Sequence, residues 1–456
     1  MLLNFQSWHI RRLREIMSPP AATDVGMPEM KKNGTTQKPA ADTDSVNGFK
    51  HAPQKPLPDF KDLPRVAGMP RTCAWGLFDT LSSSQPDEIG TLNLLTPERK
   101  VRARQEIQHG ISVAITWSLD NCETPHSGRM RPEHRIKRLP DWVGHDDEIR
   151  MNTQSGSQWD GLRHWAHQLT GLFYNGVQLK DIMGPESSLR NGIDQWSKHG
   201  GIVGRGILLD YLSWAESQGI DYSSIERHTI SEKDLEAVAA WQGTNFEVGD
   251  ILLVRSGFVK WHNNASDAER KAGIADGEAW AGVEGTEASV EWFWNHHFAA
   301  VGGDANVFEA WPAKDERYRL HDVFLAMWGM PIGEMFDLDE LAEVCKRHQR
   351  WSFFFTSAPL NFPGGVASPP NAICVLWYMM REMKMRAWNI DVGVRRNALV
   401  YIFDITQTPS FLIIGIKLKN SLVSSTTVRR HDSSRNWSMQ LSKLLDLGMA
   451  SCQWSS

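Results

Sequence analysis

The sequence predicts one α/β domain over residues 61–382, in which helices and short apolar strands alternate. Capped helical segments are separated by runs of β-branched residues, and no internal repeat is evident. The content of 41% hydrophobic and 23% charged residues is ordinary for a globular protein. These observations favour a sheet covered by helices, and they leave an α+β arrangement open.

The individual elements follow from local signals along the chain. Thr96 is a good N-cap and Pro97 suits the first helical position, so we expect a helix that runs to Gly110. Ser231 begins another helix, and Gly243 stops it. Strands are expected where β-branched and apolar residues follow such stops. The helix after Ser231 is expected over residues 232–241. The remaining predicted elements are helices over residues 291–297, 321–328 and 338–348 (the last capped by Asp337), and strands over 111–119, 251–255, 299–302 and 351–356.

Charge and composition exclude several classes of protein. The 49 basic and 54 acidic residues give a net charge of −5, which argues against a nucleic-acid binder. Five scattered cysteines without a C-x-x-C pair predict neither a disulfide scaffold nor a cysteine zinc finger, and they favour a reducing compartment. A cytoplasmic location is expected from the lack of clear targeting signals alone. Residues 399–418 are apolar but interrupted by charges and a proline, so we expect no membrane span. Twenty tryptophans indicate either a well-filled core or an aromatic pocket.

Both ends differ in composition from this domain. Residues 1–60 are polar and poor in apolar side chains, so we expect a disordered leader. Its basic first 17 residues fit either an import signal or an untargeted terminus. Residues 383–456 form a tail of doubtful foldedness, which we expect to lie outside the domain. From residue 384 onward this tail has ten Lys or Arg, four Asp and no Glu.

The densest polar cluster in the sequence lies at residues 152–168. In an extended segment Gln154, Gln158 and Asp160 point to one side, and His164 follows four residues later. Amide and carboxylate oxygens suit a hard cation such as Mn²⁺ or Mg²⁺, whereas Zn²⁺ prefers more nitrogen and sulfur. The alternative is a polar loop in which these side chains satisfy backbone groups.

This segment resembles the metal-binding signature H-x-G-T-H-x-D-x-P-x-H of the cyclase-like amidohydrolases. That family includes bacterial kynurenine formamidases and isatin hydrolases, and the chain looks closest to its fungal branch. The resemblance extends in order over roughly residues 70–375. It implies a swivelling β/β/α fold with a mixed sheet and surrounding helices. The matching segments outside the signature are residues 75–79, 87–93, 204–210, 249–257 and 364–371.

The resemblance assigns roles to individual positions. In the family, the first two histidines and the aspartate of the signature bind metal, and the last histidine is a general acid/base. A later histidine and glutamate complete the ligands. These positions match, in that order, Gln154, Gln158, Asp160, His164, His321 and Glu334.

Two of these matches are departures from the family pattern. Gln154 and Gln158 replace nitrogen ligands with weaker, neutral amide oxygens. We therefore expect one divalent ion, Mn²⁺ or Zn²⁺, held by Asp160, His321 and Glu334. The neighbouring site built on the two glutamines should be weak or empty.

The expected function is hydrolysis of a small aromatic amide, as in arylformamidases. Metal-activated water would attack, with His164 as general acid/base and Asp160 as a catalytic ligand. The alternative for His164 is a core histidine bonded to a backbone carbonyl. The expected partner is a small-molecule substrate, and a homo-oligomer is possible. The residues expected to bind substrate are Trp159, Trp165, Gln154 and Gln158.

Other interpretations remain open. The same site could close or open a ring in secondary metabolism, or the glutamine pair could bind substrate without metal. A metal-free binding scaffold is the alternative from a different class. Asp304 and Glu309 resemble family positions beside the active site but equally suit a cap or turn, and His296 and His297 fit either a pocket or a helix end. Phosphate-binding loops and the G-x-S-x-G elbow are missing from the sequence, so nucleotide-binding and serine-hydrolase functions lack support.

Overall fold

We describe a computed structural model that covers most of the predicted domain and part of the tail. The predicted leader lies outside the described residues except for its last five positions, so its disorder and its import signal remain predictions. The described residues are 56–79, 85–107 and 110–376, together with four tail strands, β14 (Arg386–Trp388), β15 (Ala398–Asp404), β16 (Phe411–Leu418) and β17 (Ser421–Arg429).

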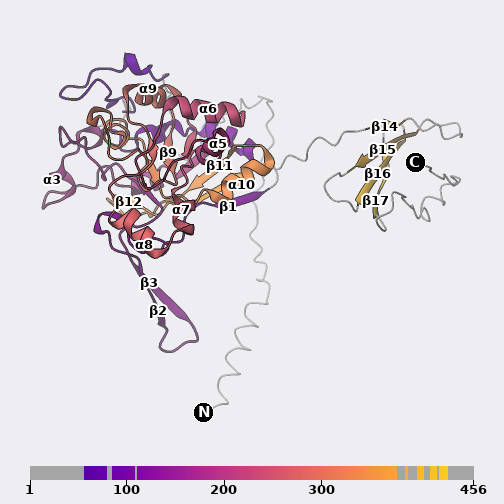
Figure 1. Ribbon diagram of the computed structural model, residues 1–456, viewed down its shortest axis with the longest axis horizontal. Helices are drawn as coiled ribbons and strands as arrows, with labels where there is room; N and C mark the ends of the chain where they lie inside the picture. The colour runs from indigo at the N-terminus through magenta and orange to yellow at the C-terminus, as the bar shows by residue number, and fades with distance from the viewer. Residues whose placement is uncertain are drawn as a thin grey trace, which may run out of the picture. The chain divides into compact units, whose positions relative to one another are not determined.

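A nine-stranded mixed sheet organises the domain, in the order β1-β13-β11-β5-β7-β9-β10-β4-β12 (Figure 1). Its centre, β5-β7-β9-β10, is parallel, and the flanking strands pair antiparallel. The expected mixed α/β fold is therefore confirmed. The strands are β1 (Ile111–Ala114), β4 (Gln158–Asp160), β5 (Ile202–Leu209), β7 (Ile251–Val254), β9 (Ala300–Gly303), β10 (Ile332–Glu334), β11 (Ser352–Ser357), β12 (Ala367–Ser368) and β13 (Ala372–Leu376).

Helices surround this sheet. Figure 1 shows α5, α6 and α9 grouped along one side of β9 and β11, and α6 contacts α5, α9 and β5. The helices are α2 (Pro97–Ala103), α3 (Leu179–Ile182), α4 (Asp194–Lys198), α5 (Tyr211–Gln218), α6 (Glu232–Gln242), α7 (Phe258–Asn264), α8 (Asp267–Arg270), α9 (Glu287–His296) and α10 (Asp339–His348).

Short turns and small sheets complete the described domain. The 3₁₀ turns are η1 (Phe60–Asp62), η2 (Gly90–Leu94), η3 (Arg104–Glu106), η4 (His126–Gly128), η5 (Tyr174–Gly176) and η7 (Glu316–Tyr318), and the π-helical turns are η6 (Lys271–Ala275) and η8 (Asp322–Trp328). Two two-stranded sheets pair β2 (Glu133–Arg138) with β3 (His145–Arg150) and β6 (Thr229–Ile230) with β8 (Gly282–Val283).

Local capping explains why several helices begin and end where the sequence predicts. The Ser231 hydroxyl accepts from the Asp234 N–H, the Asp234 carboxylate accepts from the Ser231 N–H, and Gly243 ends α6 with a φ of 65°. The helix after Thr96 is shorter than expected, because it tightens into η3 after Ala103. The N-cap of α10 is Leu338 rather than Asp337. The predicted helix over residues 321–328 is the π-helical turn η8.

Tryptophan side chains fill much of the core between the sheet and its helices. Their large apolar rings remove extensive surface from water, which stabilises a domain of this size. Most of these rings therefore serve packing rather than a pocket. The tryptophans among the largest fully buried side chains are Trp117, Trp159, Trp196, Trp280, Trp294 and Trp328.

The two ends of the predicted domain differ in what the structure describes. The Trp294 indole N–H donates to the Pro58 carbonyl oxygen, and the Phe60 N–H donates to Asn295, so the last predicted leader residues pack on α9. Strands β14–β17 form an antiparallel sheet of their own. That the tail lies outside the predicted domain stays a prediction. Among the described residues, no helix is long and apolar enough to cross a bilayer.

Candidate metal centre

Strand β4 presents two of the predicted site residues on one face. Successive side chains of a strand alternate between faces, so Gln158 and Asp160 point together while Trp159 points away. Gln158 lies opposite Glu334 of β10 in the antiparallel ladder, which places these two side chains on the same face. The sheet thus brings together residues that are more than 170 positions apart in the sequence.

The tight turn after β4 brings His164 back towards Asp160. The Gly161 N–H donates to the Val366 carbonyl oxygen, and the His164 N–H donates to the Gly161 carbonyl oxygen. A Cβ on Gly161 would lie 2.5 Å from the Val366 oxygen, so this close approach requires glycine. The distance from His164 Nε2 to Asp160 Oδ2 is 3.8 Å.

Glu309 holds His321 in a fixed orientation. One Glu309 oxygen accepts from the His321 N–H at 3.0 Å and lies 2.7 Å from His321 Nδ1, and the other accepts from the Leu320 N–H at 2.7 Å. His321 Nε2 therefore faces the site, at 3.8 Å from Asp160 Oδ2 and 3.4 Å from Glu334 Oε1. A carboxylate behind the far ring nitrogen is the usual support of a metal-binding histidine.

The two glutamines lie against the same carboxylates. Gln158 Nε2 donates to Glu334 at 2.8 Å and to Asp160 at 3.2 Å. Gln154 Nε2 donates to Asp160 at 2.6 Å and lies 3.1 and 3.3 Å from the two ring nitrogens of His164. Both amides therefore face the cluster, at the two positions that the resemblance aligns with histidines.

The pKa values of the ionisable groups reflect this crowding. Burial alone would raise the pKa of Asp160, but the charges of His164 and His321 outweigh it and lower that pKa to about 2. Burial favours neutral His321, yet its carboxylate neighbours raise its pKa well above the usual value. Burial and the charge of Asp160 raise the pKa of Glu334. Burial lowers the pKa of His164 against the opposing effect of Asp160, so His164 is neutral near pH 7.

The buried donor atoms fit a divalent cation. Asp160 Oδ2 and Gln158 Oε1 are buried without a hydrogen-bond donor in the described part of the chain. Donor atoms of Asp160, His164 and His321 all lie within 4.8 Å of one another. Two ligands about 2.1 Å from one zinc ion at the tetrahedral angle are about 3.4 Å apart, close to the separations given above. A cation here would satisfy the orphaned carboxylate oxygen.

The structure separates the two tryptophans that were expected to bind substrate. Trp159 is fully buried, and its ring packs edge-on against Trp196, Phe336 and Phe355. It lies in the core on the far side of β4, and so away from the site wall that we expected it to form. The ring of Trp165 lies 5.4 Å from His321 and 6.0 Å from His164, centre to centre. Only Trp165 therefore borders the cluster.

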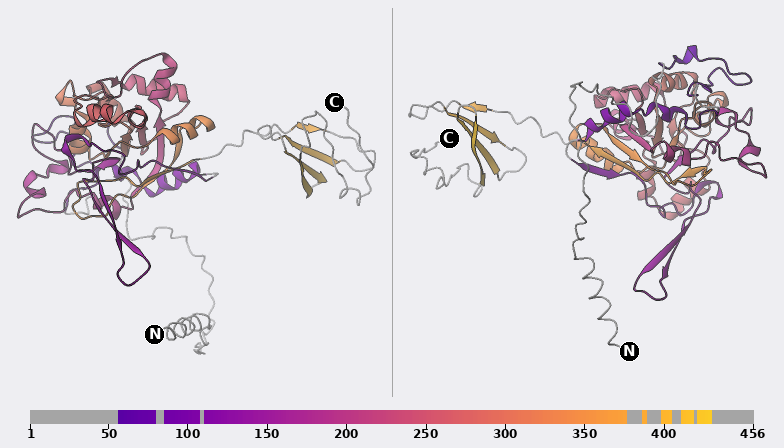
Figure 2. Two further views of the ribbon diagram at one scale, coloured as in Figure 1. Left: turned by 60° about the horizontal axis from the view of Figure 1, so that its bottom comes forward. Right: turned by 180° about the vertical axis from the view of Figure 1, so that it is seen from behind.

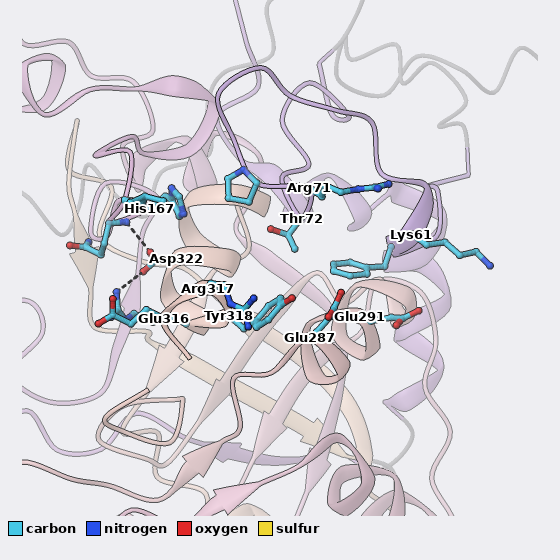
Figure 3. Close-up of a pocket in the computed structure, with 15 residues that line it drawn as sticks. Lys61, Arg71, Thr72, His167, Glu287, Glu291, Glu316, Arg317, Tyr318 and Asp322 are labelled. Atoms are coloured by element: carbon cyan, nitrogen blue, oxygen red, sulfur yellow. Dashed lines mark hydrogen bonds and ion pairs between the residues drawn. The ribbon is translucent and has the colours of Figure 1, made fainter. Parts of the chain in front are cut away.

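A cavity of about 870 Å³ lies beside this cluster (Figure 3). Asp322, which follows His321 in the sequence, lines this cavity. Its carboxylate accepts from the Trp165 indole N–H at 2.7 Å. The cluster residues Asp160, His164 and His321 do not line the cavity. Figure 3 shows His167 and Asp322 towards one end and Lys61 towards the other. Trp165 thus donates to a residue that lines the cavity, and its ring lies against both histidines of the cluster.

Other candidate residues have structural partners. Asp304 accepts from the N–H groups of Ser256 and Gly257 and from the Ser256 hydroxyl, as a turn residue does. His296 Nδ1 lies 2.8 Å from the Trp292 carbonyl oxygen at the end of α9, and His297 is the C-cap of that helix. The helix-end interpretation therefore fits both histidines.

Two residues near the site were missing from the sequence-based set. Arg129 donates to the Gln154 carbonyl oxygen at 3.0 Å and so braces the backbone of the signature. Asp322 positions Trp165 and also accepts from the Gln168 N–H. Adjacency to His321 was the one sequence signal for Asp322, whereas the contact of Arg129 depends on the folded loop.

Comparisons with known proteins agree with this fold. The sequence model of a family described as "Putative cyclase" matches residues 103–310. A crystal structure of a novel cyclase is 28% identical, with a TM-score of 0.56, and the match covers 63% of this chain and 96% of that one. An isatin hydrolase A from Ralstonia solanacearum is 16% identical, with a TM-score of 0.42, covering 65% of this chain and all of that one (100%).

Curated protein sequences gave no significant match to this chain. The family match covers the strand that carries Asp160 and the segment that carries Glu309, and the cyclase structure extends the similarity over nearly its own whole length. The chain is thus similar to the family described as "Putative cyclase" over residues 103–310, and its fold is similar to that of a solved cyclase structure.

Proposed function

We propose that this protein is a metal-dependent hydrolase that cleaves the C–N bond of a small aromatic amide. The observation that carries the proposal is the Asp160 carboxylate. Its Oδ2 atom is fully buried, has no hydrogen-bond donor among the described residues, and lies 3.8 Å from Nε2 of both His164 and His321. A buried carboxylate oxygen without a donor is costly unless a cation satisfies it.

Asp160, His321 and Glu334 would hold the single ion. They supply two carboxylates and one imidazole, which suits Mn²⁺ or Zn²⁺. When bound, a divalent ion acidifies water and polarises a carbonyl group. Glu309 keeps His321 Nδ1 engaged and leaves Nε2 to face the site.

His164 would move the proton. Its pKa is lowered by burial, so its neutral ring accepts a proton from water as the water oxygen attacks the carbonyl carbon. The C–N bond then breaks, and His164 returns the proton to the leaving nitrogen, which gives a carboxylic acid and an amine. Gln154, in contact with both ring nitrogens, would orient the imidazole.

The preference for an aromatic substrate rests on Trp165 and on the neighbouring cavity. The indole is fixed by its bond to Asp322 and turns its ring towards both site histidines. The cavity of about 870 Å³ falls within the usual range for small-molecule sites and would receive the part of the substrate that does not react.

A metal-free role is the second candidate, because the amide groups of Gln154 and Gln158 already donate to Asp160 and Glu334. Those N–H groups partly neutralise the carboxylates, as a cation would. In that case the chain would bind a small molecule without hydrolysing it. The cyclase and isatin hydrolase neighbours also make ring-opening of a cyclic aromatic amide a natural variant of the main proposal.

The test is hydrolysis of N-formylaniline and of isatin by the purified chain after loading with Mn²⁺ or Zn²⁺. We expect turnover of at least one substrate and a loss of roughly 10²–10⁴-fold in kcat for His164→Ala. The matched control is His296→Ala, which removes a half-buried helix-end imidazole and should leave kcat unchanged. Absence of turnover by the loaded wild type, or equal rates for the wild type and His164→Ala, would overturn the proposal.

A further inference from the structure

Arg129 lies beside the candidate metal centre, at the base of a projecting hairpin. Figure 1 and Figure 2 show the hairpin of β2 and β3 projecting from the body of the domain. The Asn152 N–H donates to the Met130 carbonyl oxygen across the base of this hairpin. The base therefore holds Arg129, which precedes β2, next to Gln154, which follows β3.

Gln154 connects the Arg129 guanidinium to the cluster. Arg129 Nη1 donates to the Gln154 backbone carbonyl oxygen at 3.0 Å. The side chain of the same glutamine donates to Asp160 at 2.6 Å and lies 3.1 Å from His164 Nδ1. Burial has the largest effect on the pKa values of Asp160 and His164, and the positive charge of Arg129 is among the causes that lower both. A single glutamine residue thus separates the guanidinium from both groups.

Most of the donor capacity of Arg129 is unused. A guanidinium group has five N–H donors in a planar fork, and only Nη1 of Arg129 has an acceptor in the described part of the chain. Its Nε and Nη2 atoms have no acceptor among these residues and are not sealed from solvent, since the side chain is half-buried. A charged fork of this kind, without a carboxylate partner among the described residues, is suited to bind an anion from solution.

The other two arginines near the signature are engaged differently. Arg163 is only 6% exposed, its Nη2 donates to the Ile182 carbonyl oxygen, and its Nε and Nη1 are sealed from solvent. Arg319 forms ion pairs with Glu316 and Asp322. Burial therefore closes the first to a ligand, and the second is already neutralised.

The cluster opens to solvent on the side of His164. The His164 side chain is 16% exposed, whereas those of Asp160, His321 and Glu334 are 0%, 7% and 4% exposed. The His164 imidazole contacts Gln154 and lies 6.0 Å from the ring of Trp165, centre to centre. A molecule that enters at His164 therefore meets an aromatic ring and comes close to the guanidinium that Gln154 adjoins.

We propose that Arg129 is a specificity-determining residue, which binds a carboxylate that the aromatic amide carries close to its reacting C–N bond. This inference rests on the proposed function and narrows its substrate class to anionic aromatic amides. The planar fork of the guanidinium matches a carboxylate in a bidentate pair, which fixes the orientation of the substrate towards His164. A neutral amide of similar size lacks this pair and is held more weakly.

The kinetics of 2-formamidobenzoate and N-formylaniline test the proposal, because these two amides differ only in the carboxylate. For the full chain loaded with Mn²⁺ or Zn²⁺, we expect kcat/KM to be about 10–100-fold higher for 2-formamidobenzoate. Arg129→Gln should bring the ratio of the two values close to one. Arg129→Lys, which keeps the charge but loses the fork, should retain part of the preference.

The matched control is Arg131→Gln, which removes the same charge two residues away. The Arg131 side chain is 53% exposed, and this variant should keep the wild-type ratio. The ratio also separates a substrate contact from the support that Arg129 gives to the Gln154 backbone, because loss of that support would slow both amides alike.

Binding of 2-aminobenzoate and of aniline measures the same preference without turnover. Calorimetric titration of the full chain should give at least about 10-fold tighter binding of 2-aminobenzoate, and Arg129→Gln should abolish the difference. If neither amide is hydrolysed but this difference is found, the proposed hydrolysis fails and the assignment of Arg129 stands. Equal binding of the two amines, equal kcat/KM for the two amides, or a preference that Arg129→Gln leaves intact would overturn the assignment, even when both amides are hydrolysed.

Discussion

Substitution of Glu309 should lower the metal affinity of the site, although Glu309 is not one of the proposed metal ligands. Its carboxylate is 1% exposed and accepts from the Leu320 N–H, the His321 N–H and His321 Nδ1. In Glu309→Gln one oxygen becomes an NH₂ group, which must face at least one of these buried donors. Leaving a buried donor without an acceptor costs about 1–3 kcal/mol of stability.

The same substitution removes the negative charge behind the His321 ring. Loss of such a supporting carboxylate typically weakens metal binding about 10–100-fold, or about 1.4–2.7 kcal/mol. Competition with a chromophoric chelator measures the affinity for Zn²⁺ and Mn²⁺, and urea unfolding measures stability.

Asp304→Asn is the matched control for this variant. Asp304 is also 1% exposed and accepts from the N–H groups of Ser256 and Gly257 and from the Ser256 hydroxyl. We expect a similar loss of stability in this control but unchanged metal affinity. If Glu309→Gln binds metal as tightly as the wild type, or if both variants lose affinity equally, the supporting role of Glu309 is refuted.

Three further predictions follow from the same geometry. Gln154→His combined with Gln158→His should bind Zn²⁺ at least about 10-fold more tightly in a chelator titration, because both side chains face the cluster; unchanged affinity would contradict this. Trp159→Ala should lose about 3–5 kcal/mol in urea unfolding, whereas Trp165→Ala should lose less stability and mainly raise KM for aromatic amides; the reverse pattern would refute the assignment. Gly90→Ala should lose more than about 1 kcal/mol, since its φ is +54° and a Cβ would lie 2.1 Å from the Gly329 oxygen; wild-type stability would contradict this.

Local signals in the sequence predicted the elements that depend on near neighbours. The capping box of Ser231 and Asp234 and the stop at Gly243 act within a few residues, so α6 was predictable almost to its ends. The alternation that places Gln158 and Asp160 on one face also places Trp159 on the other. The burial of Trp159 in the core could therefore have been predicted from the extended segment alone.

Local sequence signals could not predict the contacts between residues that lie far apart in the sequence. The pairing of Gln158 with Glu334 depends on the register of β4 and β10, and the support of His321 by Glu309 depends on how a loop folds back. The hairpin of β2 and β3 was not predicted, because both strands are rich in charged residues. Oppositely charged residues face each other across the pair, but apolar and polar residues do not alternate regularly along either strand. Periodicity therefore gave no strand signal.

Metal stoichiometry tests the central claim most directly. The purified chain, loaded with Mn²⁺ or Zn²⁺ and dialysed, should retain close to one ion per chain by inductively coupled plasma mass spectrometry. The Asp160→Asn variant should retain far less while it stays folded, because it loses the carboxylate that faces both histidines. A wild-type chain that retains no ion after loading, or an Asp160→Asn variant that retains as much as the wild type, would contradict the account.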